Sequence, residues 1–84
     1  MLKLGTYRHY KGNLYDVIGV ATHSETHEKF VVYRALYDTE DLGSRPLFVR
    51  PLNMFLEDVE VNGILVKRFD KIQESTSPHQ TDEV

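Results

Sequence analysis

Residues 14–38 read Leu-Tyr-Asp-Val-Ile-Gly-Val-Ala-Thr-His-Ser-Glu-Thr-His-Glu-Lys-Phe-Val-Val-Tyr-Arg-Ala-Leu-Tyr-Asp. They hold two runs rich in β-branched and aromatic residues, 14–23 and 28–38, and this composition is typical of β-strands. The four polar residues 24–27 separate the runs. The stretch therefore predicts a long hairpin, and Gly19 within its first strand indicates a β-bulge or a sharp bend.

The segments on both sides of this hairpin also predict β-structure. Residues 5–10 predict a short first strand that ends at the turn-forming residues 11–13. Residues 47–50 predict a further strand, which Pro51 ends because proline has no N–H to donate to a ladder. Residues 52–56 are too few for a stable helix and suit a single 3₁₀ turn laid across a core.

Asn62-Gly63 lies between two alternating apolar runs and is typical of a type I′ hairpin turn. A two-residue loop of this kind determines the register of the strands that it joins. The predicted pairs are Val61 with Ile64, Glu60 with Leu65, Val59 with Val66, and Asp58 with Lys67. Together these elements predict an all-β fold, a small SH3-like barrel of five to six short strands with one 3₁₀ turn. A five-stranded OB-type barrel fits less well, because no amphipathic helix is present.

The chain of 84 residues is long enough for one domain with a modest core, and we place that β-barrel domain at residues 1–73. Lys and Arg balance Asp and Glu over this range, so the net charge of −3 comes from Glu74, Asp82 and Glu83. The remaining residues, 74–84, include a single aliphatic side chain and predict a disordered tail.

The composition also excludes several function classes. The absence of cysteine removes disulfides, thiolate nucleophiles and sulfur-ligated zinc. No apolar run is long enough to cross a bilayer, so we expect a soluble cytoplasmic protein with no membrane association. The sequence assigns no catalytic residue, no cofactor and no metal ligand, and it leaves the oligomeric state open.

Polar residues with ring side chains are dense in the first half of the chain. They are Tyr7, His9, Tyr10, Tyr15, His23, Tyr33 and Tyr37. Because successive side chains of a strand point to opposite faces, the odd-numbered rings share one side and the even-numbered positions share the other. The even positions are mostly aliphatic, and we expect them to form the core: Ile18, Val20, Phe30, Val32 and Leu36.

The odd-numbered rings would then form an exposed polar-aromatic surface. The alternative is that the rings fill the barrel and that their hydroxyls reach water at its rim. A bulge at Gly19 would reverse the alternation within its strand and send Ala21 and His23 to the core side.

This pattern favours a non-catalytic binding module for a protein, a peptide or a small anionic ligand. The candidate ligand-binding residues are Tyr7, His9, Tyr15, His23, Tyr33, Tyr37 and Arg50. Arg50 is included because a guanidinium group holds a carboxylate or phosphate through two parallel hydrogen bonds. The alternative for Arg50 is an internal role, either stacking on a barrel tyrosine or a salt bridge to one of three carboxylates: Asp16, Asp38 or Glu57.

Two other function classes stay open. Small barrels bind single-stranded nucleic acid by stacking bases on strand aromatics, but the folded part of this chain is electrically neutral, so we favour this class less. A metal site or enzyme is the second alternative. It requires His9 to approach His23 across neighbouring strands, with Asp16 or Glu25 adding a carboxylate.

Several motifs, taken together, resemble a small bacterial family known only as a domain of unknown function. They are YRHYKG at residues 7–12, YDV at 15–17, GVA at 19–21, HSET at 23–26, VVYRALY at 31–37 and VRPLNMF at 49–55. The resemblance implies a stand-alone prokaryotic domain, and a compact β-barrel is consistent with it. It implies no established activity, cofactor or catalytic residue. The family favours Trp where Phe48 stands and Gly where His27 stands. His27 is therefore expected to carry strain if its turn requires a positive φ.

Overall fold

The computed structural model describes residues 2–74, with side chains up to residue 72. Within this range the elements are β1 (Gly5–His9), β2 (Leu14–Thr22), β3 (Lys29–Ala35), β4 (Asp38–Thr39), β5 (Gly43–Ser44), β6 (Leu47–Pro51), α1 (Leu52–Phe55), β7 (Asp58–Val61), β8 (Ile64–Lys67) and β9 (Phe69–Glu74). The predicted tail beyond residue 74 lies outside the described residues.

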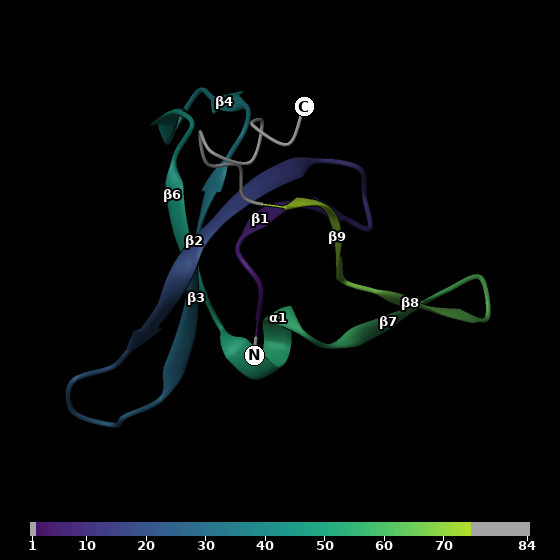
Figure 1. The fold of residues 1–84 in the computed structure, drawn as a ribbon. Helices are drawn as coiled ribbons and strands as arrows, with labels where there is room; N and C mark the ends of the chain where they lie inside the picture. The colour runs from purple at the N-terminus through teal and green to yellow at the C-terminus, as the bar shows by residue number, and fades with distance from the viewer. Residues whose placement is uncertain (1, 75–84) are drawn as a thin grey trace, which may run out of the picture.

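The main sheet has five strands in the order β6-β3-β2-β1-β9, and every neighbouring pair in it is antiparallel. Two separate ribbons, β4-β5 and β7-β8, complete the strands. Figure 1 shows the long β2–β3 hairpin crossing the molecule, α1 below the sheet, and the β7–β8 hairpin projecting to one side. The fold is therefore all-β apart from the short helix, as predicted.

The described part of the sheet stays open, with β6 and β9 as its two edge strands, so the predicted SH3-like barrel is not confirmed. Pro51 ends an edge strand, where its missing N–H interrupts no interior ladder. The predicted 3₁₀ turn is instead one turn of α-helix, because the Leu56 N–H donates to the Leu52 carbonyl at 3.1 Å. No helix in the described chain is long and apolar enough to cross a membrane, and the cytoplasmic location stays a prediction.

Both predicted hairpins are present. β7 and β8 pair as expected, from Asp58 opposite Lys67 to Val61 opposite Ile64. Their turn has φ of 54° at Asn62 and 81° at Gly63, and a type I′ turn requires positive φ at both positions. In the β2–β3 hairpin the register shifts between residues 17 and 19, so the predicted bulge is also confirmed.

The core lies on the opposite face from the one that we expected. The buried side chains are Tyr7, Tyr15, Val17, Val31, Tyr33, Ala35, Phe55 and Phe69. Of the predicted core, Ile18 and Val20 are 47% and 40% exposed, and the other three residues, Phe30, Val32 and Leu36, are half-buried. The prediction of an aliphatic core is therefore wrong, and the alternative, rings in the interior, is what the structure shows.

The reason for this inversion lies in two segments that are distant in sequence from the hairpin. Phe55 of α1 and Phe69 of β9 stack with ring centroids 4.0 Å apart, and both rings pack on the tyrosine side of the sheet. Alternation correctly groups side chains by face, but it does not say which face these rings will cover.

The bulge reverses the alternation in β2, as predicted. Val17 pairs with Tyr33 on the core side before the bulge, and Val20 pairs with Val31 on that side after it. Ala21 therefore moves to the outer face, where it pairs with Phe30. His23 is exposed and also lies against the ring of Phe30, so it points outward rather than into the core.

Candidate functional site

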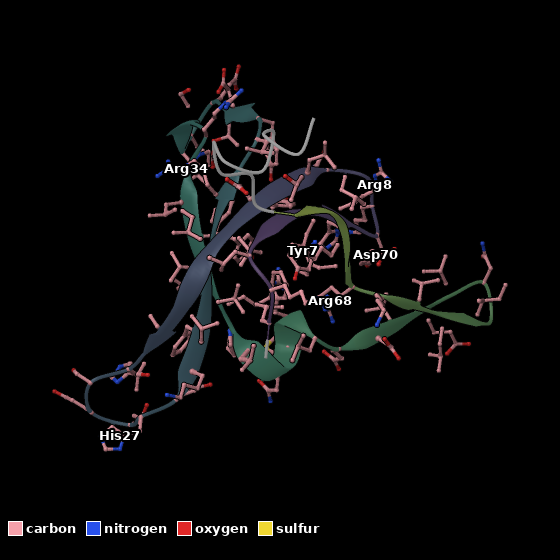
Figure 2. All side chains as sticks on the ribbon, viewed as in Figure 1. Tyr7, Arg8, His27, Arg34, Arg68 and Asp70 are labelled. Atoms are coloured by element: carbon pink, nitrogen blue, oxygen red, sulfur yellow. The ribbon has the colours of Figure 1, made fainter. Side chains whose placement is uncertain are left out.

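The structure brings together six of the seven candidate site residues on the concave side of the sheet. Tyr7, Tyr15 and Tyr33 are buried there. The half-buried members of the group are His9, Tyr37 and Arg50. His23 lies apart from them, exposed at the β2–β3 turn, and Figure 2 shows this turn, marked by its neighbour His27, far from Tyr7. The rings form an interior cluster, not an exposed aromatic surface.

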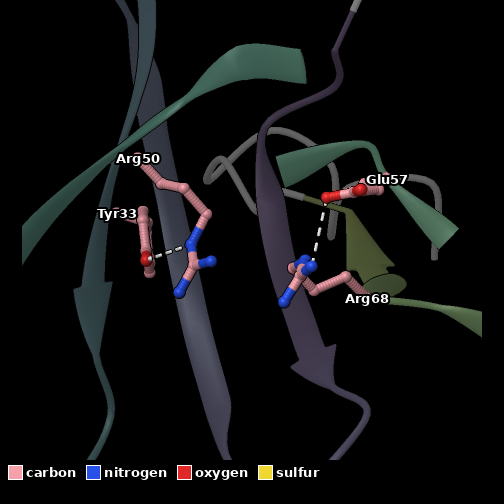
Figure 3. Close-up of polar contacts among 4 residues, drawn as sticks. All are labelled: Tyr33, Arg50, Glu57 and Arg68. Atoms are coloured by element: carbon pink, nitrogen blue, oxygen red, sulfur yellow. Dashed lines mark hydrogen bonds and ion pairs between the residues drawn. The ribbon is translucent and has the colours of Figure 1, made fainter. Parts of the chain in front are cut away.

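Each buried tyrosine hydroxyl has a hydrogen-bond partner at the edge of this cluster. Tyr7 donates to the carbonyl of Lys3 at 2.6 Å. The hydroxyls of Tyr15 and Tyr37 lie 2.6 Å apart. Tyr33 accepts a hydrogen bond of 3.1 Å from Nε of Arg50 (Figure 3). The rings can therefore be buried without leaving a hydroxyl unpaired.

Phe69 is the central residue that the sequence reasoning missed. Its ring contacts the rings of His9, Tyr15 and Tyr33 at centroid distances of 4.9, 5.7 and 5.5 Å. Cζ of Arg50 lies 5.5 Å from the centre of the same ring. The strand that carries Phe69 reads Phe-Asp-Lys-Ile-Gln-Glu, which lacks the apolar alternation that reveals a strand. A single aromatic residue was the only signal available.

Arg50 extends from β6 across the concave side and is oriented by two contacts. Its Nε donates to Tyr33, and its guanidinium lies over the ring of Phe69. Among the side chains of residues 2–72 no carboxylate pairs with Arg50, and its two terminal nitrogens make no hydrogen bond there. The alternative of an internal salt bridge is thus not observed. The guanidinium stacks on a phenylalanine instead of a tyrosine.

A second arginine faces the same region from the segment that precedes β9. Nη2 of Arg68 lies 3.1 Å from Oε1 of Glu57, and in Figure 3 the guanidinium groups of Arg68 and Arg50 are turned toward each other. Nε of Arg68 is buried and has no hydrogen-bond partner among the described residues. The concave side therefore carries more positive charge than Glu57 balances.

The pKa of His9 is affected by this positive charge. Burial lowers the pKa of His9, and the neighbouring charges of Arg50, Arg68 and Lys11 lower it further. Its Nδ1 accepts a hydrogen bond of 3.2 Å from the backbone N–H of Lys11, which requires an unprotonated Nδ1. His9 is therefore a neutral, edge-on ring at neutral pH, and the positive charge of the site comes from arginine.

The geometry offers little to acid–base or metal chemistry. Burial raises the pKa of Tyr15, and its hydrogen bond to Tyr37 raises it further, so a phenolate is strongly disfavoured at neutral pH. His9 lies against Tyr15 at the start of β2, whereas His23 follows the end of that strand. The described residues contain no group of three His, Asp or Glu side chains placed to hold a metal ion.

Comparison with known proteins identifies the family. Residues 5–71 match the family described as "Protein of unknown function (DUF1653)". A crystal structure of a DUF1653 protein from Bordetella bronchiseptica is 34% identical, with a TM-score of 0.77, and the match covers 90% of this chain and 94% of that one. A comparison with curated proteins finds no match. The resemblance seen in the sequence motifs is confirmed, and this chain belongs to the DUF1653 family of proteins of unknown function.

Proposed function

We propose that the protein is a non-catalytic binding module that captures a carboxylate or phosphate group at Arg50. The observation that carries this proposal is the guanidinium of half-buried Arg50, held by Tyr33 and Phe69, with no carboxylate partner among the side chains of residues 2–72. A guanidinium in this state retains the donors that bind an oxyanion through two parallel hydrogen bonds. The group it binds belongs to a small anionic ligand or to an acidic side chain of a protein partner.

Preorganisation supports this assignment. Because Nε already donates to Tyr33, the guanidinium plane is set before a ligand arrives, and less side-chain entropy is lost on binding. The hydroxyl of Tyr33 accepts this bond through its oxygen, so its own proton stays available for donation to the same anion. Arg68 adds a second positive charge nearby.

Single-stranded nucleic acid, the alternative class, has less support. Base stacking needs accessible ring faces, and the three tyrosines that would provide them, Tyr7, Tyr15 and Tyr33, are at least nine-tenths buried. The remaining cationic groups would have to bind phosphates without this stacking contribution.

The experiment is a ¹H–¹⁵N NMR titration of the full chain with inorganic phosphate and with citrate. We expect saturable shifts at the amides around Tyr33, Arg50 and Phe69. Arg50→Lys keeps the charge but loses both the fork geometry and the bond to Tyr33, so we expect binding to weaken on the order of tenfold.

Arg45→Lys is the matched control, because Arg45 is exposed and outside the cluster, and it should bind like the wild type. Thermal unfolding of both variants separates lost binding from lost folding. The proposal is wrong if neither anion shifts these amides, or if a folded Arg50→Lys protein binds both anions as the wild type does.

A further inference from the structure

A second concave feature, separate from the terminal nitrogens of Arg50, lies beside α1. It is a cleft of about 690 Å³, a volume within the range of small-molecule sites. Its apolar lining includes Val20 of β2, Leu52 and Leu56 at the two ends of α1, and Leu2 of the N-terminal segment. Val20 and Leu56 are both exposed, so this apolar lining is open to solvent.

The charges around this cleft are strongly one-sided. Among the described residues four lysines line it, Lys3, Lys29, Lys67 and Lys71, against the single acidic residue Asp70. The chain as a whole carries a net charge of −3, so this surplus of positive charge is local. The lysines come from four separate segments of the chain, and the fold alone gathers them around one opening. A concave site lined by charge of one sign concentrates ligands of the opposite sign.

We propose that this cleft binds a small amphipathic anion, an aliphatic chain that ends in a carboxylate or phosphate. The chain would lie on the aliphatic lining from β2 and α1, where its burial removes apolar surface from water on both sides. The head group would sit among the lysine ammonium groups, which are point charges suited to either kind of anion. The occupant is a free molecule and not a membrane surface, because the site is a bounded cleft with walls from β2, β3, β9 and α1.

The probe is decanoate, kept below its micelle concentration and titrated calorimetrically into the full chain. Decyl phosphate tests the second head group, and decanol tests the need for charge. We expect saturable binding of both anions and weaker binding of decanol, on the order of tenfold for the loss of a charge that several lysines attract. Added salt should weaken anion binding, since three of the four lysines, Lys3, Lys29 and Lys67, are exposed.

Two pairs of variants locate the site. Val20→Trp fills the cleft from the concave side and should abolish binding, whereas Val49→Trp, on an exposed position of β6 outside the cleft, should not. The double change Lys3→Glu, Lys29→Glu should weaken decanoate binding on the order of tenfold, and Lys11→Glu, which lies outside the cleft, should leave it unchanged. Circular dichroism confirms that each variant is folded.

The outcomes separate this site from the one at Arg50. Decanoate binding that Val20→Trp abolishes and Arg50→Lys preserves supports the cleft proposal, whatever the phosphate titration shows. The proposal is overturned if the wild type binds no decanoate, or if a folded Val20→Trp protein binds it normally. It is also overturned if the protein sediments with anionic phospholipid vesicles while binding no monomeric decanoate, which would assign the lysines to a membrane surface.

Discussion

The hydroxyl oxygens of Tyr15 and Tyr37 lie 2.6 Å apart, although 22 residues separate them in the sequence. Their rings meet edge to face at a centroid distance of 5.6 Å. This pair joins the start of β2 to the loop that follows β3. We expect Tyr37→Phe to lower the free energy of unfolding by about 1 kcal/mol, because the Tyr15 hydroxyl loses its hydrogen bond to Tyr37.

A double-mutant cycle in urea measures this interaction. Tyr15→Phe should cost a similar amount, and the double variant should cost less than the sum of the two single changes. Strictly additive costs would show that the hydroxyls do not interact in solution.

The depressed pKa of His9 predicts that the protein becomes less stable as the pH is lowered. At pH values above the ordinary histidine pKa of 6.5, His9 is neutral in both the folded and unfolded states, and its contribution is complete. As the pH drops through 6.5, the unfolded chain binds a proton that the folded protein resists, so the free energy of unfolding decreases until the folded pKa is passed. Urea midpoints between about pH 5 and 8 measure this slope.

His9→Gln should flatten part of that pH dependence, because it removes the imidazole whose pKa differs between the folded and unfolded states. Arg50→Gln removes one of the charges that lower the pKa of His9, so NMR titration of the imidazole should show a higher pKa in this variant. An unchanged His9 titration would contradict the arrangement of charges described above.

His27 has a φ of 66° in the β2–β3 turn, which confirms the strain expected for a side chain at this position. Replacing it by glycine removes the clash of Cβ with its own backbone. We expect His27→Gly to raise the free energy of unfolding by about 1 kcal/mol. Ser24→Gly, in the same turn but without a positive φ, is the control and should lose about 0.5 kcal/mol through greater freedom of the unfolded chain. Stabilisation by both changes would point to a general benefit of glycine in this turn.

Phe55 is the buried residue of α1. It is 1% exposed and touches the rings of Tyr7, Tyr33 and Phe69. Phe55→Ala should cost about 3–5 kcal/mol, a large part of the total stability of so small a domain. Met54→Ala, an exposed change in the same helical turn, should stay within about 0.5 kcal/mol. Chemical denaturation monitored by circular dichroism compares the two.

Local features of the fold could be read from the sequence because they depend on neighbouring residues. The predictions of the Asn62-Gly63 turn and its register are confirmed, as are those of the β2–β3 hairpin and its bulge. β9 was not predicted, because Lys71, the partner of Tyr7 on the neighbouring strand β1, interrupts the alternation of apolar and polar residues within β9. Strand pairing with β1, a distant segment, creates this element.

In the candidate site too, local features were predicted correctly and features that depend on distant segments were not. Grouping by alternation correctly placed Tyr7, Tyr15 and Tyr33 on one face, but it gave the wrong answer about which face is buried. Which face is buried depends on the stack of Phe55 on Phe69, and no local sequence pattern predicts this stack. Arg50 was selected for its chemistry, and its orientation by Phe69 could be learned only from the three-dimensional arrangement.

The pairing of β1 with β9 has a consequence for biosynthesis. β1 is made first and β9 last among the strands of the main sheet, and each is the neighbour of the other. While the ribosome is still adding residues 69–74, one side of β1 has no strand to pair with, and the tyrosine cluster lacks Phe69. Contacts of such long sequence separation make folding slow, so completion of the sheet should wait until translation has passed β9.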